Sequence, residues 1–153
     1  MYLATESDIV EKVCKAHNIA KFMRDKTISA CMLATAFHNP VDVVNPTTIK
    51  LGINDWHDLI FMSRSPISYP KAALNYTYYK NMGVYAMTKE SLDFFLNTKP
   101  GNLERVEEIE LLRLLENHKK IKAVIVKSDS MAVDTQKDLE WIKSIMPPPL
   151  YYN

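Results

Sequence analysis

The longest patterned stretch of the chain, from Leu103 to Ile142, predicts a helix, a strand, a loop and a second helix. Apolar residues recur at near-helical spacing in its first part; they are Leu103, Val106, Ile109, Leu112 and Leu115, with Leu111 and Leu114 widening the stripe. Ile121 to Val126 is a β-branched run with one lysine, typical of a largely buried strand. Thr135 predicts the N-cap of the last helix, which places Asp134 just outside it. Ligands of open α/β sheets usually bind at such sheet edges.

The upstream part of the chain predicts further buried strands and one amphipathic helix. Ser7 is the expected N-cap of that helix, which would run to about Ala16. The expected strands are Tyr2 to Thr5, Ile19 to Met23, Ala30 to Phe37 and Gly83 to Met87. A strand, a helix and a strand in so few residues indicate a βαβ unit and a parallel sheet.

A hairpin or tight turn is predicted at Asn54-Asp55, because apolar runs at Ile49 to Ile53 and Leu59 to Met62 flank it. The sequence leaves open whether Trp56 and His57 lie in the turn or open the second strand.

The segment Ser63 to Tyr79 is rich in proline and hydroxyl side chains and is expected to be a loop. Thr88 predicts the cap of a helix with the apolar face Leu92, Phe95 and Leu96. The sequence contains no repeat or internal linker, so we expect one α/β domain over residues 1–146 and a proline-rich tail over 147–153. The expected architecture is a mixed, mostly parallel sheet flanked by helices.

The composition of the chain argues against some classes of binding partner. The chain has 153 residues, 47% hydrophobic and 24% charged, and a net charge of +1, which argues against nucleic acid or an anionic membrane as an electrostatic partner. No apolar run reaches transmembrane length. Cys14 and Cys31 show no zinc-like or disulfide pattern and are expected to be reduced. Glu6 and Asp8 argue against a signal peptide, so the expected location is the cytoplasm.

Three motifs, in order, carry a resemblance to a known family. They are SRSPI at Ser63 to Ile67, YYKNMGVYAM at Tyr78 to Met87, and LERVEEIELLRLLENHKKIKAVIV followed by AVDTQKDLEWI. Together they resemble the C-terminal part of the CMP-Kdo synthetases (3-deoxy-manno-octulosonate cytidylyltransferases) over most of the chain from Ala30 to Ile142. The resemblance implies a nucleotide-diphospho-sugar transferase-like fold and transfer of CMP from CTP to an acidic sugar, Kdo above all. It also implies Mg²⁺ as cofactor, a homodimer and a place in lipopolysaccharide biosynthesis.

The resemblance also implies a sugar pocket. Arg64 of SRSPI is a candidate for gripping the sugar carboxylate, because guanidinium presents a bidentate fork. Gly83 and Tyr85 match the family's sugar-pocket strand. Asn81 stands where the family commonly has His, and its amide can still hydrogen-bond a sugar hydroxyl although it does not titrate near neutral pH.

Two carboxylates complete the implied site. Glu110 falls where a family Glu contacts the sugar, whereas Leu111 stands where the family has Gln. Asp134 matches the Asp of the family's V-D-T motif, which the resemblance implies is a magnesium ligand. Without the resemblance, Asp134 would be interpreted as a solvated residue beside a helix cap.

Two family features have no counterpart in the sequence. The family opens with a Gly-containing phosphate loop, but Gly52, Gly83 and Gly101 do not form one. It also carries a Q-G-D-E-P motif with a second metal-binding Asp, for which the chain offers only Asp25 to Ser29. We therefore expect either part of a longer enzyme or a degenerate relative. The alternatives are a cytidylyltransferase for another acidic, sialic-acid-like sugar, or an inactive remnant that serves as a sugar-binding or dimerisation module.

Because the phosphate loop and the Q-G-D-E-P motif both lack a counterpart in the sequence, we predict that CTP binds residues 1–153 weakly or not at all. Titration calorimetry with CTP and Mg²⁺, using an intact CMP-Kdo synthetase as the control, measures this. Tight, magnesium-dependent binding by the chain would contradict the prediction and place the nucleotide elsewhere in the sequence.

Overall fold

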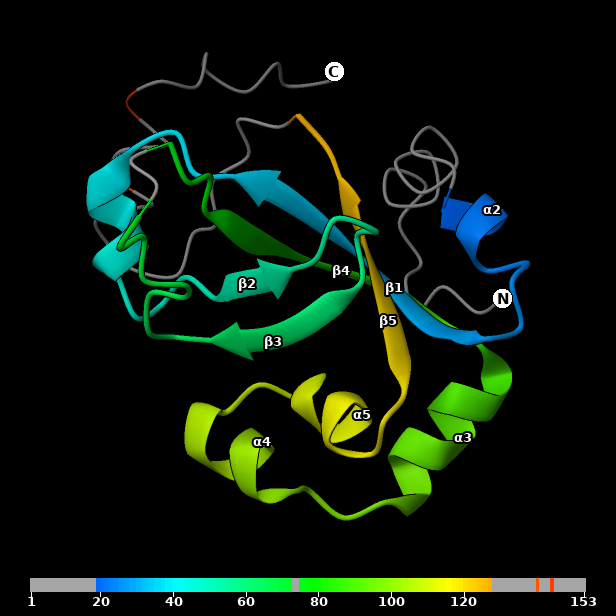
Figure 1. Ribbon diagram of the computed structural model, residues 1–153. Helices are drawn as coiled ribbons and strands as arrows, with labels where there is room; N and C mark the ends of the chain where they lie inside the picture. Colours follow the sequence, from blue (N-terminus) through cyan, green and yellow to red (C-terminus); the bar gives the residue numbers. More distant parts are fainter. Residues whose placement is uncertain (1–18, 73–74, 128–139, 141–143, 145–153) are drawn as a thin grey trace, which may run out of the picture.

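The computed structural model describes residues 19–72, 75–127, 140 and 144 (Figure 1). Its helices and strands are, in chain order, α2 (Ile19–Phe22), β1 (Ile28–Ala36), the 3-10 helix η1 (Pro40–Val44), β2 (Lys50–Ile53), β3 (Leu59–Ser63), β4 (Tyr79–Met87), α3 (Lys89–Asn97), α4 (Asn102–Glu107), α5 (Leu112–Glu116) and β5 (Lys120–Ile125).

The described strands form one mixed sheet in the order β3-β2-β4-β1-β5. The pairing of β1 with β5 is parallel, while β1 with β4, β2 with β3 and β2 with β4 are antiparallel. The prediction of a mixed sheet with helices is confirmed. Parallel pairing does not predominate in the described residues, because the β2–β3 hairpin and the strand β4 that returns beside β1 both run antiparallel to their neighbours.

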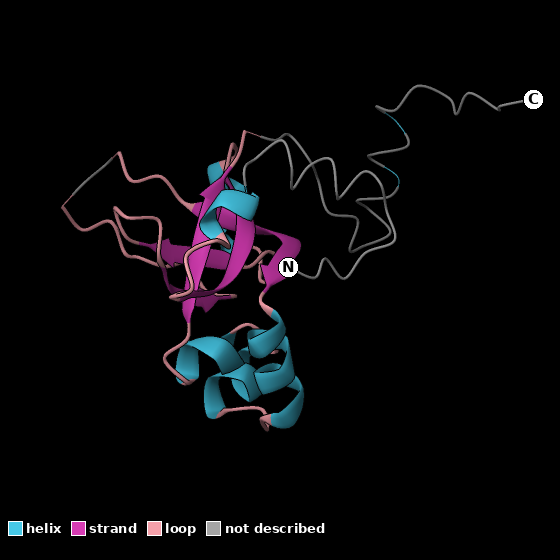
Figure 2. Ribbon diagram, turned by 90° about the vertical axis from the view of Figure 1, so that its right-hand side faces the viewer, coloured by secondary structure: helices cyan, strands magenta, loops and turns pink. Residues whose placement is uncertain are grey.

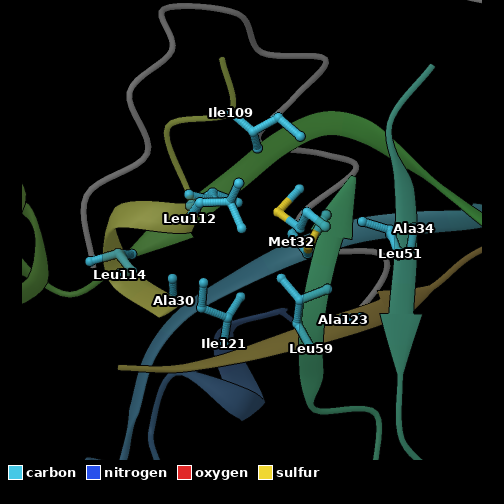
Figure 3. Packing of buried hydrophobic residues seen from close by; sticks show 12 residues of the cluster. Ala30, Met32, Ala34, Leu51, Leu59, Ile109, Leu112, Leu114, Ile121 and Ala123 are labelled. Carbon is cyan, nitrogen blue, oxygen red and sulfur yellow. The ribbon is translucent and has the colours of Figure 1, made fainter. Parts of the chain in front are cut away.

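The two faces of the sheet carry separate hydrophobic clusters. Helices α3, α4 and α5 gather on one side of the strands (Figure 2), and α2 packs on the other. The larger cluster brings Ile109, Leu112 and Leu114 against the sheet (Figure 3). Its fully or largely buried members are Ala30, Met32, Ala34, Leu51, Leu59, Met62, Ile109, Leu111, Leu112, Leu114, Ile121 and Ala123. The leucine-rich stretch therefore supplies much of this core.

The predicted hairpin is confirmed, and Trp56 and His57 lie in its turn. The Asn54 side chain accepts from the backbone N–H groups of Trp56 (3.0 Å) and Asp58 (2.8 Å), and His57 has a positive φ of 61°. The turn reaches over to the far end of the sheet, where Asp58 bridges Lys122 of β5. Lys122 Nζ lies 2.7 Å from Asp58 Oδ1 and donates to the carbonyl of Trp56. The tip of the hairpin is thus fastened to the strand at the opposite end of the sheet order.

The prediction of a strand at Ile19 to Met23 is wrong, because the first four of these residues form helix α2. The Met23 N–H donates to the Ile19 carbonyl at 3.1 Å, which is the helical i to i−4 bond. Ile19 is fully buried in the smaller cluster. The segment is apolar because one turn of helix covers the sheet.

The leucine-rich stretch is two short helices, not the one helix that its spacing predicts. Helix α4 ends at Glu108, which adopts the left-handed conformation (φ 52°, ψ 49°), and α5 begins at Leu112. The break lets Ile109 and Leu111 both point into the core, at 1% and 3% exposure. It leaves Val106 exposed at 74%. Burial of the second half of the stripe therefore overrides the helical period across the whole of it.

The two short helices are joined by charged side chains. Arg113 of α5 donates to both carboxylate oxygens of the buried Glu104 of α4, and its guanidinium stacks 4.0 Å from the ring centre of Phe95. Glu116 accepts at the N-terminus of α4 from the backbone N–H of Leu103 (2.9 Å) and of Glu104 (3.2 Å). Each helix thus supplies a polar group that the other one needs.

Gly101, the N-cap residue of α4, makes room for that carboxylate. The residue supplies no side-chain cap, and a Cβ added there would collide with the Glu116 carboxylate. A cap from a distant residue thus replaces the usual local one.

The remaining predictions divide between confirmation and correction. Strands β1 and β5 and the Thr88 cap of α3 are confirmed, since the Thr88 hydroxyl accepts from Ser91 N. In α3 it is Phe94, not Leu96, that joins Phe95 against the core, and Leu96 is 71% exposed. The strand at Tyr2 to Thr5, the Ser7 helix, Asp134 with Thr135, and the tail lie outside the described residues. Among the residues described, no helix is long and apolar enough to span a membrane.

Truncation of Leu112 to Ala should lower the free energy of unfolding by about 2–5 kcal/mol, as usual for a buried leucine. Leu112 is fully buried between α5 and the sheet. Val106→Ala is the matched control, because Val106 is mostly exposed in the same leucine-rich stretch, and it should change stability by less than about 0.5 kcal/mol. Urea unfolding measures both. Equal costs for the two variants would contradict the broken-helix arrangement.

The Glu116 cap should make stability depend on pH in the acid range. Its pKa is lowered from 4.5, chiefly because the Leu103 N–H donates to the carboxylate. The unfolded chain then takes up this proton at a higher pH than the folded chain does, so the contribution is complete above about pH 4.5 and disappears as the pH falls through the lowered pKa of the folded state.

Glu116→Gln should therefore reduce the loss of thermal stability between pH 5 and pH 3, as measured by circular dichroism. Glu90→Gln, at an exposed position on α3, is the control and should retain the parental pH dependence. An unchanged pH profile in Glu116→Gln would show that the carboxylate does not cap α4 in solution.

Candidate functional site

Strand β4 carries three of the predicted sugar-pocket residues on one face, because Asn81, Gly83 and Tyr85 alternate along it. The strand bulges there. Met32 of β1 pairs with Tyr85 and Ala34 pairs with Asn81, so three residues of β4 stand opposite the single residue Leu33. Gly83 sits in the bulge with a φ of 73°, a conformation that favours glycine. The bulge explains why a glycine occupies this position.

The bulge brings a polar pair together. The Asn81 Nδ2 donates to the Tyr85 hydroxyl at 2.5 Å, and the Asn81 Oδ1 accepts from Gly83 N at 2.9 Å. Burial raises the pKa of the Tyr85 phenol; the Asn81 hydrogen bond opposes this rise and the charge of Glu110 adds to it. The phenol is therefore neutral around pH 7 and can donate its own proton to an acceptor on a ligand.

Glu110 lies in the turn between α4 and α5, and its side chain is exposed. Its neighbours Ile109 and Leu111 are buried in the larger cluster, against which the Tyr85 ring also packs. The structure thus brings Asn81, Tyr85 and Glu110 to the same part of the molecule. An amide, a phenol and a carboxylate are suited to binding the hydroxyl groups of a sugar.

Arg64 is engaged within the protein. Its Nε donates to the Glu107 carbonyl at 2.7 Å, its Nη1 to the Pro46 carbonyl at 3.1 Å and its Nη2 to the Glu108 carbonyl at 3.3 Å. Glu107 is the last residue of α4 and Glu108 is its C-cap. Carbonyls at a helix C-terminus lack partners within the helix, and a cation there is favourable. The guanidinium predicted to hold a sugar carboxylate thus binds the end of α4.

The backbone of Arg64 is held by two residues that the sequence interpretation missed. Glu107 accepts from Arg64 N at 2.8 Å and from the Ser63 hydroxyl at 2.7 Å. The ammonium of Lys50 donates to the Arg64 carbonyl at 2.5 Å, and to the carbonyls of Asn45 (2.6 Å) and Thr48 (2.8 Å). The available signal was a lysine inside an apolar run, TIKLGI.

Lys50 is fully buried. Burial lowers the pKa of its ammonium; the nearby charge of Glu107 opposes this change and that of Arg64 adds to it. Three carbonyls occupy the three donors of the ammonium, which is what allows a charged lysine to stay inside.

The predicted metal ligand Asp134 lies outside the described residues. Within the described part of the chain, no group of three or more His, Cys, Asp or Glu side chains could hold a metal ion. The sugar-pocket prediction thus divides into a cluster at β4 and Glu110, an arginine used at the end of α4, and a metal ligand that the structure does not place.

The chain is similar to a solved structure of a CMP:2-keto-3-deoxy-manno-octonic acid synthetase complexed with CTP. The TM-score is 0.74 and the sequence identity 28%, over 85% of this chain and 54% of the other. The described residues form a mixed five-stranded sheet with flanking helices, and the domain has the nucleotide-diphospho-sugar transferase fold.

The chain belongs to the cytidylyltransferase family, whose model matches residues 30–121, more than half of the sequence. The match covers Arg64, Asn81, Gly83, Tyr85 and Glu110.

Curated relatives give the same picture as the family match. A 3-deoxy-manno-octulosonate cytidylyltransferase of Desulfosudis oleivorans is 30% identical over 84% of this chain and 52% of its own length. One of Chloroherpeton thalassium is 38% identical over 72% and 46%. An 8-amino-3,8-dideoxy-manno-octulosonate cytidylyltransferase of Shewanella frigidimarina is 38% identical over 62% and 39%. The resemblance stated from the motifs is confirmed, and the chain spans about half the length of the curated relatives it matches.

Proposed function

We propose that this chain is the sugar-binding part of a CMP-Kdo synthetase, an enzyme that transfers CMP from CTP to Kdo and releases pyrophosphate. The observation that carries the proposal is that the family match includes β4 and Glu110, where the structure brings Asn81, Tyr85 and Glu110 together. CTP is proposed as the nucleotide because the similar solved structure is of a synthetase complexed with CTP.

In this proposal the residues of the chain act on the sugar. Tyr85 and Asn81 form hydrogen bonds to sugar hydroxyls, and Gly83 keeps the bulge that sets their spacing. Glu110 accepts from a hydroxyl group and so orients the ring. Orientation of the attacking hydroxyl contributes to rate, because the transfer needs that oxygen in line with the α-phosphate of CTP.

Mg²⁺ is part of the proposal, with Asp134 as one ligand. A hard carboxylate oxygen beside phosphate oxygens is the donor set that magnesium prefers. The metal would neutralise charge that develops on the transferring phosphoryl group. A homodimer in the cytoplasm, where CTP is available, completes the proposal by analogy with the family.

Pyrophosphate release from CTP, Mg²⁺ and Kdo, measured in the complete protein that carries this sequence, tests the reaction. Turnover with Kdo is expected to exceed that with N-acetylneuraminate. It should also exceed turnover with the 8-amino-3,8-dideoxy analogue, the sugar in the name of one relative. Absence of turnover with all three acidic sugars would contradict the enzymatic proposal and favour a binding or dimerisation module.

Asp134→Asn should abolish magnesium-dependent turnover while leaving the melting temperature unchanged or slightly raised, because the charge of a hard metal ligand is lost and no structural metal is implied. The loss should appear in kcat, since the metal acts on charge that develops during transfer. Asp93→Asn, at an exposed position on α3, is the control. Parental turnover in Asp134→Asn would contradict the proposal that Asp134 is a magnesium ligand.

A further inference from the structure

The Arg64 side chain presents a problem for its predicted role as a sugar ligand. A bidentate grip on a carboxylate through the edge of the guanidinium uses Nε and a terminal nitrogen. Nε carries a single hydrogen, which already goes to the Glu107 carbonyl at 2.7 Å. The nitrogens Nη1 and Nη2 each donate to another carbonyl, of Pro46 and of Glu108. The Nε edge of the fork is therefore occupied by the protein itself, and each terminal nitrogen keeps one N–H that these bonds do not use.

The carbonyls that Arg64 holds are at a decisive place in the chain. Glu107 is the last residue of α4, and Glu108 is the left-handed residue at which the chain turns away from the helix axis. Glu110 follows two residues later. Ile109 and Leu111, on either side of it, are anchored in the core. The direction of the backbone at Glu108, together with the burial of Ile109 and Leu111, determines where the Glu110 carboxylate lies relative to β4.

We propose that Arg64 is a positioning residue: by holding the Glu107 and Glu108 carbonyls, it fixes Glu110 beside Tyr85, and it does not itself bind the sugar. Glu107 and Lys50 belong to the same device. The Glu107 carboxylate holds the N–H of Arg64, and the buried Lys50 ammonium holds its carbonyl. The backbone of Arg64 is thus held by Glu107 and Lys50, while its side chain binds the end of α4.

The positioning role of Arg64 can be tested without substrate, through the pKa of Tyr85. The Glu110 charge contributes to the raised pKa of the Tyr85 phenol. Glu110→Gln should therefore lower the Tyr85 pKa. Arg64→Lys keeps the positive charge but loses the planar fork, so that Glu110 is released and the Tyr85 pKa falls towards its value in Glu110→Gln.

The experiment is a pH titration of the whole chain with tyrosine labelled at Cζ and followed by NMR, with Tyr85→Phe to assign the signal. Arg105→Met is the matched control, because Arg105 also lies on α4 and donates to a backbone carbonyl, that of Pro100. It should leave the Tyr85 pKa unchanged. If Glu110→Gln lowers the pKa and Arg64→Lys does not, the proposal is overturned. If Glu110→Gln has no effect, the link between Glu110 and Tyr85 fails and the proposal with it.

Glu107→Gln is the second variant, in case Arg64→Lys does not fold. It leaves Arg64 in place and weakens the hold on its N–H, because a charge-assisted hydrogen bond becomes a neutral one. The expected change in the Tyr85 pKa has the same direction and is smaller. If Arg64→Lys does not fold and Glu107→Gln keeps the parental Tyr85 pKa, the proposal is also overturned.

A Kdo titration of the same samples separates positioning from direct binding, and this arm rests on the proposed function. Glu110→Gln should weaken binding about tenfold, the usual effect of losing a hydrogen bond to a charged group. The double variant with Arg64→Lys should bind no more weakly than Glu110→Gln, because both changes remove the same contact. A further tenfold loss in the double variant would make Arg64 a ligand in its own right and overturn the proposal. If the parental chain binds no Kdo, the sugar assignment fails, and the Tyr85 titration still decides the role of Arg64.

Discussion

The left-handed turn at Glu108 is the constraint on which the helical side of the domain depends. It ends α4 after six residues and sends the chain back, so that α5 can bury its leucines against the sheet. The charged contacts on both sides of the turn suit only this arrangement. Arg113 reaches Glu104 and Glu116 reaches the start of α4, because the two short helices lie side by side. One continuous helix would separate these partners.

Two irregular backbone positions, the bulge in β4 and the turn at Glu108, determine where the polar groups of the candidate site lie. Tyr85 beside the bulge and the residues of the turn after α4 pack in the same hydrophobic cluster, on one face of the sheet. Between them they bring an amide, a phenol and a carboxylate together on a hydrophobic base. The turn is stabilised by a side chain from elsewhere in the chain, that of Arg64, and the bulge lies opposite Leu33 of β1.

Local patterns in the sequence predicted the parts of the fold that depend on the burial of single strands and on local turn and cap residues. The apolar runs of β1 and β5, the β2–β3 hairpin and the Thr88 cap follow from alternation, β-branching and turn residues. The break at Glu108 did not follow, since the leucine spacing fits a helix and only the tertiary core shows that Ile109 and Leu111 must both be buried. The same limit applies to Arg64, because its motif resembles that of the family but does not show which oxygens the guanidinium binds. The candidate pocket residues were proposed through the family resemblance, and only the structure shows that the bulge brings Asn81 to Tyr85.

The fastening of the hairpin tip to β5 also bears on how the domain avoids self-association. In the described sheet, β3 and β5 are the two outermost strands, and an outermost strand offers unpaired backbone groups to any other chain. Here Asp58 bridges Lys122, so each outermost strand shields part of the other. Lys120 and Lys122 add charges along β5, and both lie close to Asp58. Backbone pairing and two ionic contacts at one turn therefore cover part of both edges, so the hairpin tip limits the strand surface that is open to another chain.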